Sequence, residues 1–217
     1  MKKIILLIGN GSQFKVARSL INSDLYKISN LKINLRNDIV TEQNNVYLKY
    51  FFKKQISKKI FIFIAIGSNY HRKIISKFLD LNFKDKFSYI SIISNQSNVS
   101  SNVKIGKGTI IMPGVTINTD TIIGKHCIIN TNSSVDHDNR IGSFSSLGPG
   151  TNTGGNVIIG SNTHIGIGSS IKNNITIKNN VVVGGGSFVN KFCNSNSLYY
   201  GVPTKFIKKR KLKDTYL

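Results

Sequence analysis

The sequence of 217 residues contains no tryptophan, only two cysteines and only nine acidic residues. Two cysteines are too few for the disulfide framework on which small secreted domains depend. We therefore expect free thiols in a reducing compartment, and a cytoplasmic protein.

Long hydrophobic runs are also missing. The basic start Met1-Lys2-Lys3 resembles the beginning of a signal peptide, but only five apolar residues, Ile4 to Ile8, precede Gly9. The apolar region of a signal peptide needs about 7 to 15 residues and a transmembrane helix about 20. We expect no leader peptide and no stable insertion into a membrane.

The shortage of acidic residues leaves a net charge of +21, from 30 lysines and arginines. This charge favours an anionic partner, such as nucleic acid, a membrane surface or a polyphosphorylated small molecule. However, the 26 asparagines and the absent tryptophan are typical of the codon bias of an AT-rich genome. A surface for single-stranded nucleic acid combines basic with aromatic side chains, and aromatics are nearly absent from Val99 to Val183. We expect no nucleic-acid partner.

One residue class recurs every six positions from Val99 to Val189. Fifteen of these sixteen residues are aliphatic, and the exception is Thr153. The residue two positions earlier is small or β-branched except at Asn139, and the residue that follows is mostly glycine or asparagine, which tolerate a positive φ in a turn. A constant period of six predicts a parallel β-helix of about five coils, each closed by three short walls. Chance patterning in a β-sandwich would instead slip in phase at turns of varied length.

The first 95 residues read as strands alternating with helices. Ile4–Ile8 and Ile60–Ile66 are buried-strand runs that end in glycine turns at Gly9 and Gly67, and helical spacing follows each turn. This order predicts a small parallel sheet of the Rossmann type, whose ligands bind at the carboxyl ends of the strands. A tight turn with no ligand is the alternative for Gly9. Residues 22–59 show little pattern beyond a strand near Leu31 to Leu35, and a last strand is expected near Phe87 to Ile93.

His137 stands between two of the four acidic residues that follow Asp85, namely Asp136 and Asp138. The repeat places this histidine at a corner of the β-helix, where a neighbouring carboxylate would raise its pKa and orient its ring for general-base catalysis. A solvated turn histidine is the alternative. A zinc site of His126, His137 and His164 is disfavoured, because the period places them on different coils and edges.

Several segments resemble, in order and spacing, the bacterial sialic-acid O-acetyltransferase/PglD-like amino-sugar N-acetyltransferase family of left-handed β-helix enzymes. They span nearly the whole chain: Gly9-Asn10-Gly11, Phe63 to Asn69 with Arg72, Ile129-Asn130-Thr131, Val135-Asp136-His137-Asp138, Gly142-Ser143-Phe144, Gly184-Gly185-Gly186 and Gly201-Val202-Pro203-Thr204-Lys205.

The resemblance implies three parts: an α/β domain for a nucleotide sugar (residues 1–95), a left-handed parallel β-helix with acetyltransferase activity (96–192), and a cap with a basic tail (193–217). It implies that His137 is the general base and that Asp138 orients it. It also implies a homotrimer that holds acetyl-CoA between subunits. The positions of the histidines in the repeat, and not the resemblance, are the reason why we expect no metal.

For acetyl-CoA, the family's contacts fall on Ser146, Ile167 and Gly185. Ile167 and Gly185 are eighteen residues apart, so the repeat independently stacks them on one edge. Relatives often have histidine in place of Ser146, and we hypothesise that His164, one coil later, supplies the imidazole. A surface histidine without a role is the alternative.

For the sugar nucleotide, the resemblance points to Gly11, Ser12, Gln13, Gly67 and Tyr70. Gln13 lies where relatives commonly have a histidine, so the substrate contact there differs. The family's acidic residues after the second strand have no clear counterpart; Asn34, Asn37 and Asp38 are the candidates.

The interpretation is an acetyl-CoA-dependent N-acetyltransferase for a UDP-linked amino sugar in glycan biosynthesis. O-acetylation of a sialic-type sugar is the alternative within the family. A basic nucleic-acid-binding module and a non-catalytic β-solenoid are the alternatives from other classes. The tail from Lys205 to Lys213 could attract CoA phosphates, touch an anionic membrane or be a solvated end.

Overall fold

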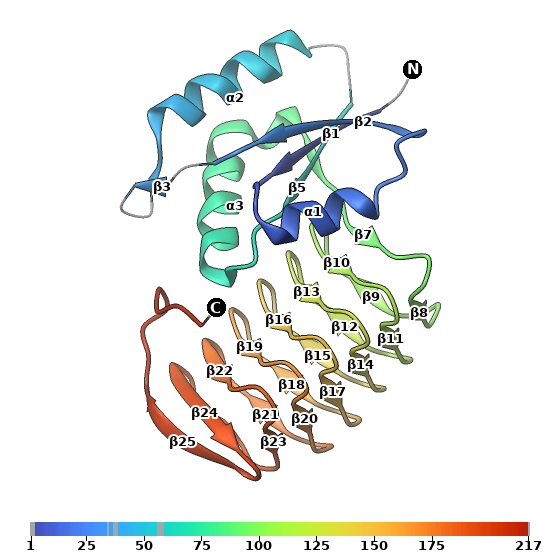
Figure 1. Cartoon of the computed structure of the whole chain (residues 1–217), viewed down its shortest axis with the longest axis vertical. Helices are drawn as coiled ribbons and strands as arrows, with labels where there is room; N and C mark the ends of the chain where they lie inside the picture. The colour runs from blue at the N-terminus through green and yellow to red at the C-terminus, as the bar shows by residue number, and fades with distance from the viewer. Residues whose placement is uncertain (1–2, 34, 37–38, 56–58, 217) are drawn as a thin grey trace. The chain divides into compact units, whose positions relative to one another are not determined.

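The computed structural model describes residues 3–33, 35–36, 39–55 and 59–216 (Figure 1). The chain divides into two compact units, Met1–Ile92 and Ile93–Leu217. An α/β unit therefore precedes a left-handed parallel β-helix, and the predicted fold class is confirmed.

The first unit is a parallel sheet with strand order β2-β1-β5-β6. Its elements are β1 (Lys3–Ile8), α1 (Ser12–Ser19), β2 (Tyr26–Leu31), the short antiparallel pair β3 (Leu35–Arg36) and β4 (Ile39–Val40), α2 (Glu42–Lys54), β5 (Ile60–Ile64), α3 (Asn69–Phe83), the 3-10 helix η1 (Lys84–Lys86) and β6 (Ser88–Tyr89). Strands β1 and β5 are buried almost throughout, which is why their sequences are continuous apolar runs.

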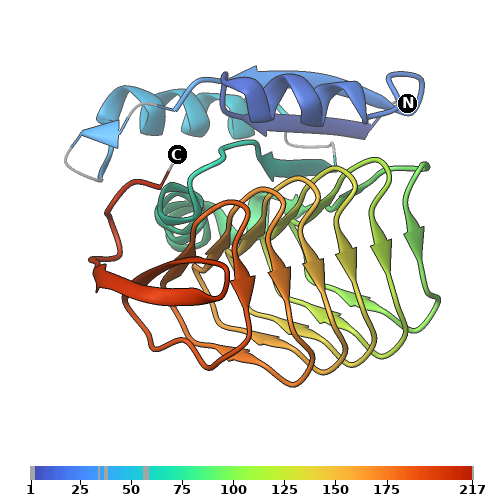
Figure 2. The ribbon, with the colours of Figure 1, turned by 60° about the horizontal axis from the view of Figure 1, so that its bottom comes forward.

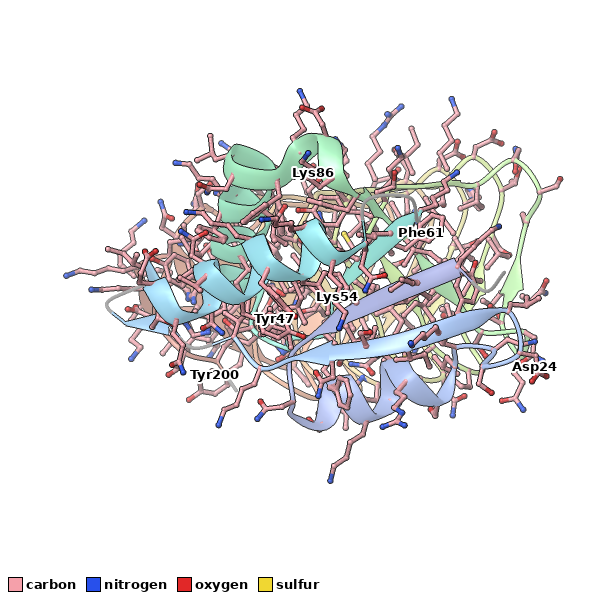
Figure 3. The ribbon with its side chains drawn as sticks, turned by 90° about the horizontal axis from the view of Figure 1, so that it is seen from above. Asp24, Tyr47, Lys54, Phe61, Lys86 and Tyr200 are labelled. Carbon is pink, nitrogen blue, oxygen red and sulfur yellow. The ribbon has the colours of Figure 1, made fainter. Side chains whose placement is uncertain are left out.

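Two expectations for this unit are wrong. The second strand ends at Leu31 rather than starting there, and residues 22–59, for which the sequence predicts one strand and no helix, contain the thirteen-residue helix α2. Leu48, Phe51 and Phe52 form the buried face of α2, whereas Tyr47 and Tyr50 on the same helix are exposed. Figure 3 shows α2 with Tyr47 labelled. The exposed aromatics hide the helical period that a purely polar outer face would have revealed.

The second unit stacks about six turns, in which three walls follow one another along the chain (Figure 2). The first wall consists of β7 (Ile92–Ile93), β10 (Ile110–Ile111), β13 (Ile128–Ile129), β16 (Ser146–Leu147), β19 (His164–Ile165), β22 (Val181–Val183), β24 (Ser197–Gly201) and β25 (Thr204–Lys209). The second consists of β8 (Asn98–Val99), β11 (Thr116–Ile117), β14 (Ser134–Val135), β17 (Asn152–Thr153), β20 (Ser170–Ile171) and β23 (Phe188–Val189). The third consists of β9 (Lys104–Ile105), β12 (Ile122–Ile123), β15 (Arg140–Ile141), β18 (Ile158–Ile159) and β21 (Thr176–Ile177).

As far as β22 and β23, strands in each wall pair in parallel with residues eighteen positions away, such as Ile110 with Ile128; β24 pairs in parallel with β22 at a spacing of sixteen, and β25 is antiparallel to β24. The predicted last strand near Phe87 to Ile93 is split between the two units, because β6 joins the α/β sheet and β7 joins the first wall. The first wall also gains β24 beside β22, so the stack is slightly longer than the five coils expected.

Hydrogen bonding explains why small hydroxyl residues recur two positions before the aliphatic residue of the repeat. Thr109, Ser133, Ser145, Thr163 and Ser169 are buried, and each donates its hydroxyl to a backbone carbonyl fifteen residues later. A hydroxyl at this position donates a hydrogen bond to a carbonyl that would otherwise be buried in the corner between coils without a partner. Serine and threonine can therefore occupy this buried position as readily as valine.

The interpretation of the glycines is wrong. Positive φ occurs three residues after the aliphatic position, as at His126 and Asp138, and not at the glycine that directly follows it. Glycine is needed there for space, because a Cβ on Gly106 would lie 2.5 Å from the carbonyl carbon of Gly124. At these glycines the next coil lies too close to leave room for a side chain.

Candidate active site

His137 lies in the turn between β14 and β15, at the corner between the second and third walls. Its side chain is 54% exposed, and its Nδ1 is 2.8 Å from Oδ2 of Asp138. Because a carboxylate only accepts hydrogen bonds, Nδ1 carries the proton and Nε2 is the basic atom of the neutral ring. The hydrogen bond to Asp138 raises the pKa of His137 above its ordinary value.

Asp136 supports the same turn from its other side. Its Oδ1 accepts hydrogen bonds from Asn118 Nδ2, at 2.9 Å, and from the backbone N–H of His137, at 2.8 Å. The bond from Asn118, followed by the bond from His137, lowers the pKa of Asp136. Asp136 is thus charged near neutral pH, and of the two acidic side chains it is Asp138 that is bonded to the imidazole.

Thr153 and Asn139, the two exceptions to the repeat, both form hydrogen bonds with the backbone of the turn that carries His137. Thr153 accepts a hydrogen bond from the backbone N–H of Asp136, at 3.2 Å, through its Oγ1. Asn139 is fully buried, and its Nδ2 donates to the carbonyls of Asp136, His137 and Gly154, at 2.7, 3.2 and 2.9 Å. Polar atoms replace apolar ones inside the β-helix where they fix the backbone that carries His137. The sequence showed these departures, but only the structure explains them.

Gly155, one coil beyond His137, leaves room for the imidazole ring. A Cβ built on Gly155 would lie 2.5 Å from Cε1 and 2.6 Å from Nε2 of His137. The ring therefore rests against a residue without a side chain.

The expected acetyl-CoA residues gather around a pocket of about 330 Å³ beside the first wall. The residues that line the pocket include His164, Tyr216, Ile167, Val182 and Gly185. Ile167 and Gly185 contact one another on successive coils, since a Cβ on Gly185 would lie 3.0 Å from Cγ2 of Ile167.

Ser146 and His164 are brought together by the stacking of β16 on β19. Ser146 Oγ lies 2.8 Å from Nδ1 of His164. Ser146 is buried and His164 is partly buried, so the imidazole, rather than the serine, reaches the pocket. Tyr216 stacks on the other side of His164, with ring centroids 4.4 Å apart.

One chain does not bring His137 to this pocket. Ile167 and Gly185 lie in the turns between the first and second walls, whereas His137 lies between the second and third. The width of the second wall separates them, about 20 Å for six residues at ~3.3 Å each.

In the first unit, the two predicted glycine turns lie at one edge of the sheet. The ends of β1 and β5 are adjacent, with Ile8 paired to Ile64. Gly9 has a φ of 137°, and a Cβ there would lie 2.4 Å from the carbonyl oxygen of Ala65. The two turns therefore touch, and the N-termini of α1 and α3 begin beside them.

The predicted sugar-nucleotide residues surround these turns. Gly11 and Ser12 are exposed at the start of α1, and Gly67 and Tyr70 are partly exposed at the start of α3. Gln13 Nε2 is buried and has no hydrogen-bond partner among the described residues. Asn34, Asn37 and Asp38 lie outside the described residues.

Arg72 fixes the second turn, and its part in the site could not be read from the sequence. Its buried guanidinium donates to the carbonyls of Ile66 and Gly67, at 3.0 and 2.6 Å, and to Asn69 Oδ1, at 2.6 Å. Ser68 caps α3 by accepting the N–H of His71 at 3.3 Å.

The three histidines considered for zinc remain apart in the stack. His126 is buried against Phe144, with ring centroids 5.0 Å apart, and it occupies a different corner from His137. Over the ranges that the structure describes, no group of three or more His, Cys, Asp or Glu residues is placed to hold a metal ion. No helix in the same ranges is long and apolar enough to cross a membrane.

The bacterial transferase hexapeptide model matches residues 102–137. PerB from Caulobacter crescentus, solved with CoA and GDP-perosamine, is 29% identical, covers 94% of this chain and 97% of its own, and superimposes with a TM-score of 0.77. The acetyltransferase domain of PglB from Neisseria gonorrhoeae, solved with acetyl coenzyme A, is 24% identical over 95% of this chain and 100% of its own, with a TM-score of 0.80.

WeeI from Acinetobacter baumannii AYE has the same fold, with 24% identity, a TM-score of 0.76 and coverage of 95% of this chain and 100% of its own. No curated protein sequence matches the chain. The matched repeat and these likenesses show that the chain has the left-handed β-helix fold with hexapeptide repeats and that it is similar to sugar acetyltransferases of this fold.

Proposed function

We propose that this protein transfers the acetyl group of acetyl-CoA to the amine of a nucleotide-linked amino sugar, with UDP as the expected nucleotide, in glycan biosynthesis. The observation that carries the proposal is the exposed imidazole of His137, bonded through Nδ1 to Asp138 and therefore basic at Nε2. PerB, which was solved with CoA and a GDP-linked sugar, supports the same pair of substrates. The free thiols of Cys127 and Cys193 suit the cytoplasmic location that belongs to this proposal.

In the proposed reaction, the amine nitrogen attacks the carbonyl carbon of the thioester. His137 Nε2 takes the proton that the nitrogen loses as the C–N bond forms. The tetrahedral intermediate then expels the CoA thiolate, and the imidazolium returns the proton to sulfur. Asp138 holds the ring in one tautomer and stabilises its charged form, which is the role its 2.8 Å contact with Nδ1 permits.

The proposed site needs two copies of the chain. The base and the acetyl-CoA pocket lie on different corners of one β-helix, so a second chain must bring its own corner to the pocket. Three copies around an axis parallel to a three-sided stack would form three such sites, and we propose a homotrimer.

The α/β unit is proposed to hold the sugar nucleotide. Its two touching turns place the N-termini of α1 and α3 at the carboxyl edge of the sheet, where the helix N–H groups favour phosphate. Gln13, with its buried amide nitrogen, is proposed to contact the substrate in place of the histidine of relatives.

The substrate test is an assay of thiol release from acetyl-CoA with UDP-amino sugars, GDP-amino sugars and CMP-sialic acids. We expect turnover with a UDP-amino sugar and a loss of at least about 100-fold in kcat for His137→Ala. Turnover of sialic acids alone would favour O-acetylation, and full activity of His137→Ala would remove the proposed base.

Complementation tests the shared site. His137→Ala and Ile167→Asp are each expected to be inactive alone, and Ile167 is 63% exposed, so its replacement should leave the fold intact. Mixed oligomers contain some sites with both native residues and should regain part of the activity. Mixtures that stay inactive, or a monomer in sedimentation, would contradict the proposal.

A further inference from the structure

The chain after β25 turns back along the β-helix and is held there by Arg210. This arginine is 8% exposed, and its backbone N–H donates to the carbonyl of Asn196 at 2.9 Å. Its Nη1 contacts both oxygens of Asn180, and its Nη2 donates to the carbonyl of Asp214 at 2.6 Å. A buried guanidinium with these partners fixes the path of the last residues against the stack.

The tail closes on itself as well. Asp214 Oδ2 accepts the backbone N–H of Lys211 at 2.7 Å, and its own N–H donates to the Lys211 carbonyl at 3.2 Å. The Arg210 guanidinium also lies 5.9 Å from the centre of the Tyr216 ring. The turn from Arg210 to Asp214 thus fixes the position of Tyr216.

That position is at the pocket proposed for acetyl-CoA. Tyr216 stacks on His164 at 4.4 Å with an interplanar angle of 24°, and both side chains line the pocket. His164 is in turn held by Ser146 at 2.8 Å. Serine, imidazole and phenol form one row that begins inside the first wall and ends with the tail.

The row leaves the pocket open rather than filling it. About 330 Å³ remains, and the rest of the lining is mostly aliphatic or glycine, including Ile167, Val182, Gly184 and Gly185. A slender, mostly apolar chain such as the pantetheine arm of CoA fits such a lining. Lys211 and Lys213, both exposed on the same tail, carry positive charge that would attract the phosphates of CoA.

We propose that Tyr216 is a binding residue for acetyl-CoA: the tail anchored by Arg210 forms a clamp whose aromatic ring covers the bound ligand and slows its release. This inference rests on the proposed function, because it assigns a role at the acetyl-CoA pocket. It gives the C-terminal tail a task in the site beyond that of a solvated end.

The first experiment compares acetyl-CoA binding by calorimetry, and its release in stopped flow, for the full-length protein and Tyr216→Ala. Removing one face of aromatic contact should raise Kd about tenfold, equivalent to about 1.4 kcal/mol, mainly through faster release. KM for acetyl-CoA should rise similarly, whereas kcat and KM for the sugar should change less than about twofold. Tyr216→Phe keeps the stack and should bind like the native protein.

The second experiment exploits the absence of tryptophan from the chain. In Tyr216→Trp, the single indole should change its fluorescence as acetyl-CoA is added, with a midpoint at the Kd from calorimetry. Tyr50→Trp, on the exposed face of α2 and 63% exposed as tyrosine, is the matched control and should not respond.

The outcomes separate the two ideas. If the native protein binds acetyl-CoA and Tyr216→Ala binds it within twofold, the clamp is refuted while the proposed function stands. If Tyr216→Trp and Tyr50→Trp respond equally, Tyr216 is not at the ligand. Failure of the native protein to bind acetyl-CoA overturns both proposals.

Discussion

A methyl group on Gly155 would occupy the space against which the His137 imidazole rests. The added Cβ would lie 2.5 Å from Cε1 and 2.6 Å from Nε2, whereas ordinary contacts begin near 3.4 Å. Gly155 does not have a positive φ, so alanine fits the backbone and only the ring has to move.

The ring must retreat by about 1 Å, and a displacement of this size can cost about 100-fold in rate. The same movement lengthens the Nδ1 contact with Asp138, which removes the cause of the raised pKa of His137. We therefore expect Gly155→Ala to lower kcat by about 100-fold and to shift the acidic limb of the pH profile to lower pH.

Stability should respond differently from activity. The His137 side chain is 54% exposed and has space to rotate, and replacing a glycine of ordinary φ with alanine favours folding by about 0.4 to 1 kcal/mol. The melting temperature of Gly155→Ala should therefore stay the same or rise slightly.

Steady-state kinetics with acetyl-CoA and the amino sugar, together with thermal denaturation, make the measurement. The matched control is Gly155→Ala in a His137→Ala background, where there is no ring to displace and no further loss is expected. Native activity in the folded Gly155→Ala protein would refute the argument, and a lower melting temperature would show that the backbone, not the ring, had been disturbed.

Three further predictions concern the corner and the core. Asp138→Asn should return the pKa of His137 toward its ordinary value; because the neutral ring is the base, the activity lost as pH falls should then be lost at lower pH, and the plateau rate should drop about tenfold or more. Thr153→Val removes the acceptor of the Asp136 N–H and should lower the free energy of unfolding by about 1 to 3 kcal/mol in urea denaturation. Ile129→Ala, at a fully buried inward position, should cost about 2 to 5 kcal/mol in the same measurement; a cost below about 1 kcal/mol would show that the coils collapse to fill the cavity.

The β-helix was predictable because its period leaves little choice. Each residue type repeats at one position of a short wall, so the inward set, the corners and the eighteen-residue pairing follow from counting. The corner position of His137 and the stacking of Ile167 with Gly185 follow in the same way. What the repeat does not encode is the spacing between coils, and this spacing, rather than backbone conformation, explains glycines such as Gly106.

The α/β unit was less predictable, because hydrophobic periodicity is its main signal. Strands β1 and β5 are recognisable in the sequence as apolar runs. In α2, by contrast, Tyr47 and Tyr50 are exposed, so the apolar residues of this helix do not follow a clear helical period. The role of Arg72 depends on three partners in a turn that no spacing rule predicts.

The contribution of Tyr216 was also beyond the sequence. It stacks on a histidine fifty-two positions earlier only because Arg210 directs the tail back to the first wall. Composition indicated that the end of the chain is basic. Only the tertiary contacts show that its Tyr216 side chain lines the pocket beside His164.

Strand β25 forms the outer edge of the largest sheet. A terminal strand with open hydrogen-bonding groups invites another molecule to continue the sheet, and repetitive folds are exposed to this hazard at both ends. Lys205, Lys208 and Lys209 lie exposed along β25, the strand at the end of the stack in Figure 1, so two molecules approaching end to end would meet with like charges. Part of the basicity of this chain thus lies where like charges oppose end-to-end pairing of solenoids.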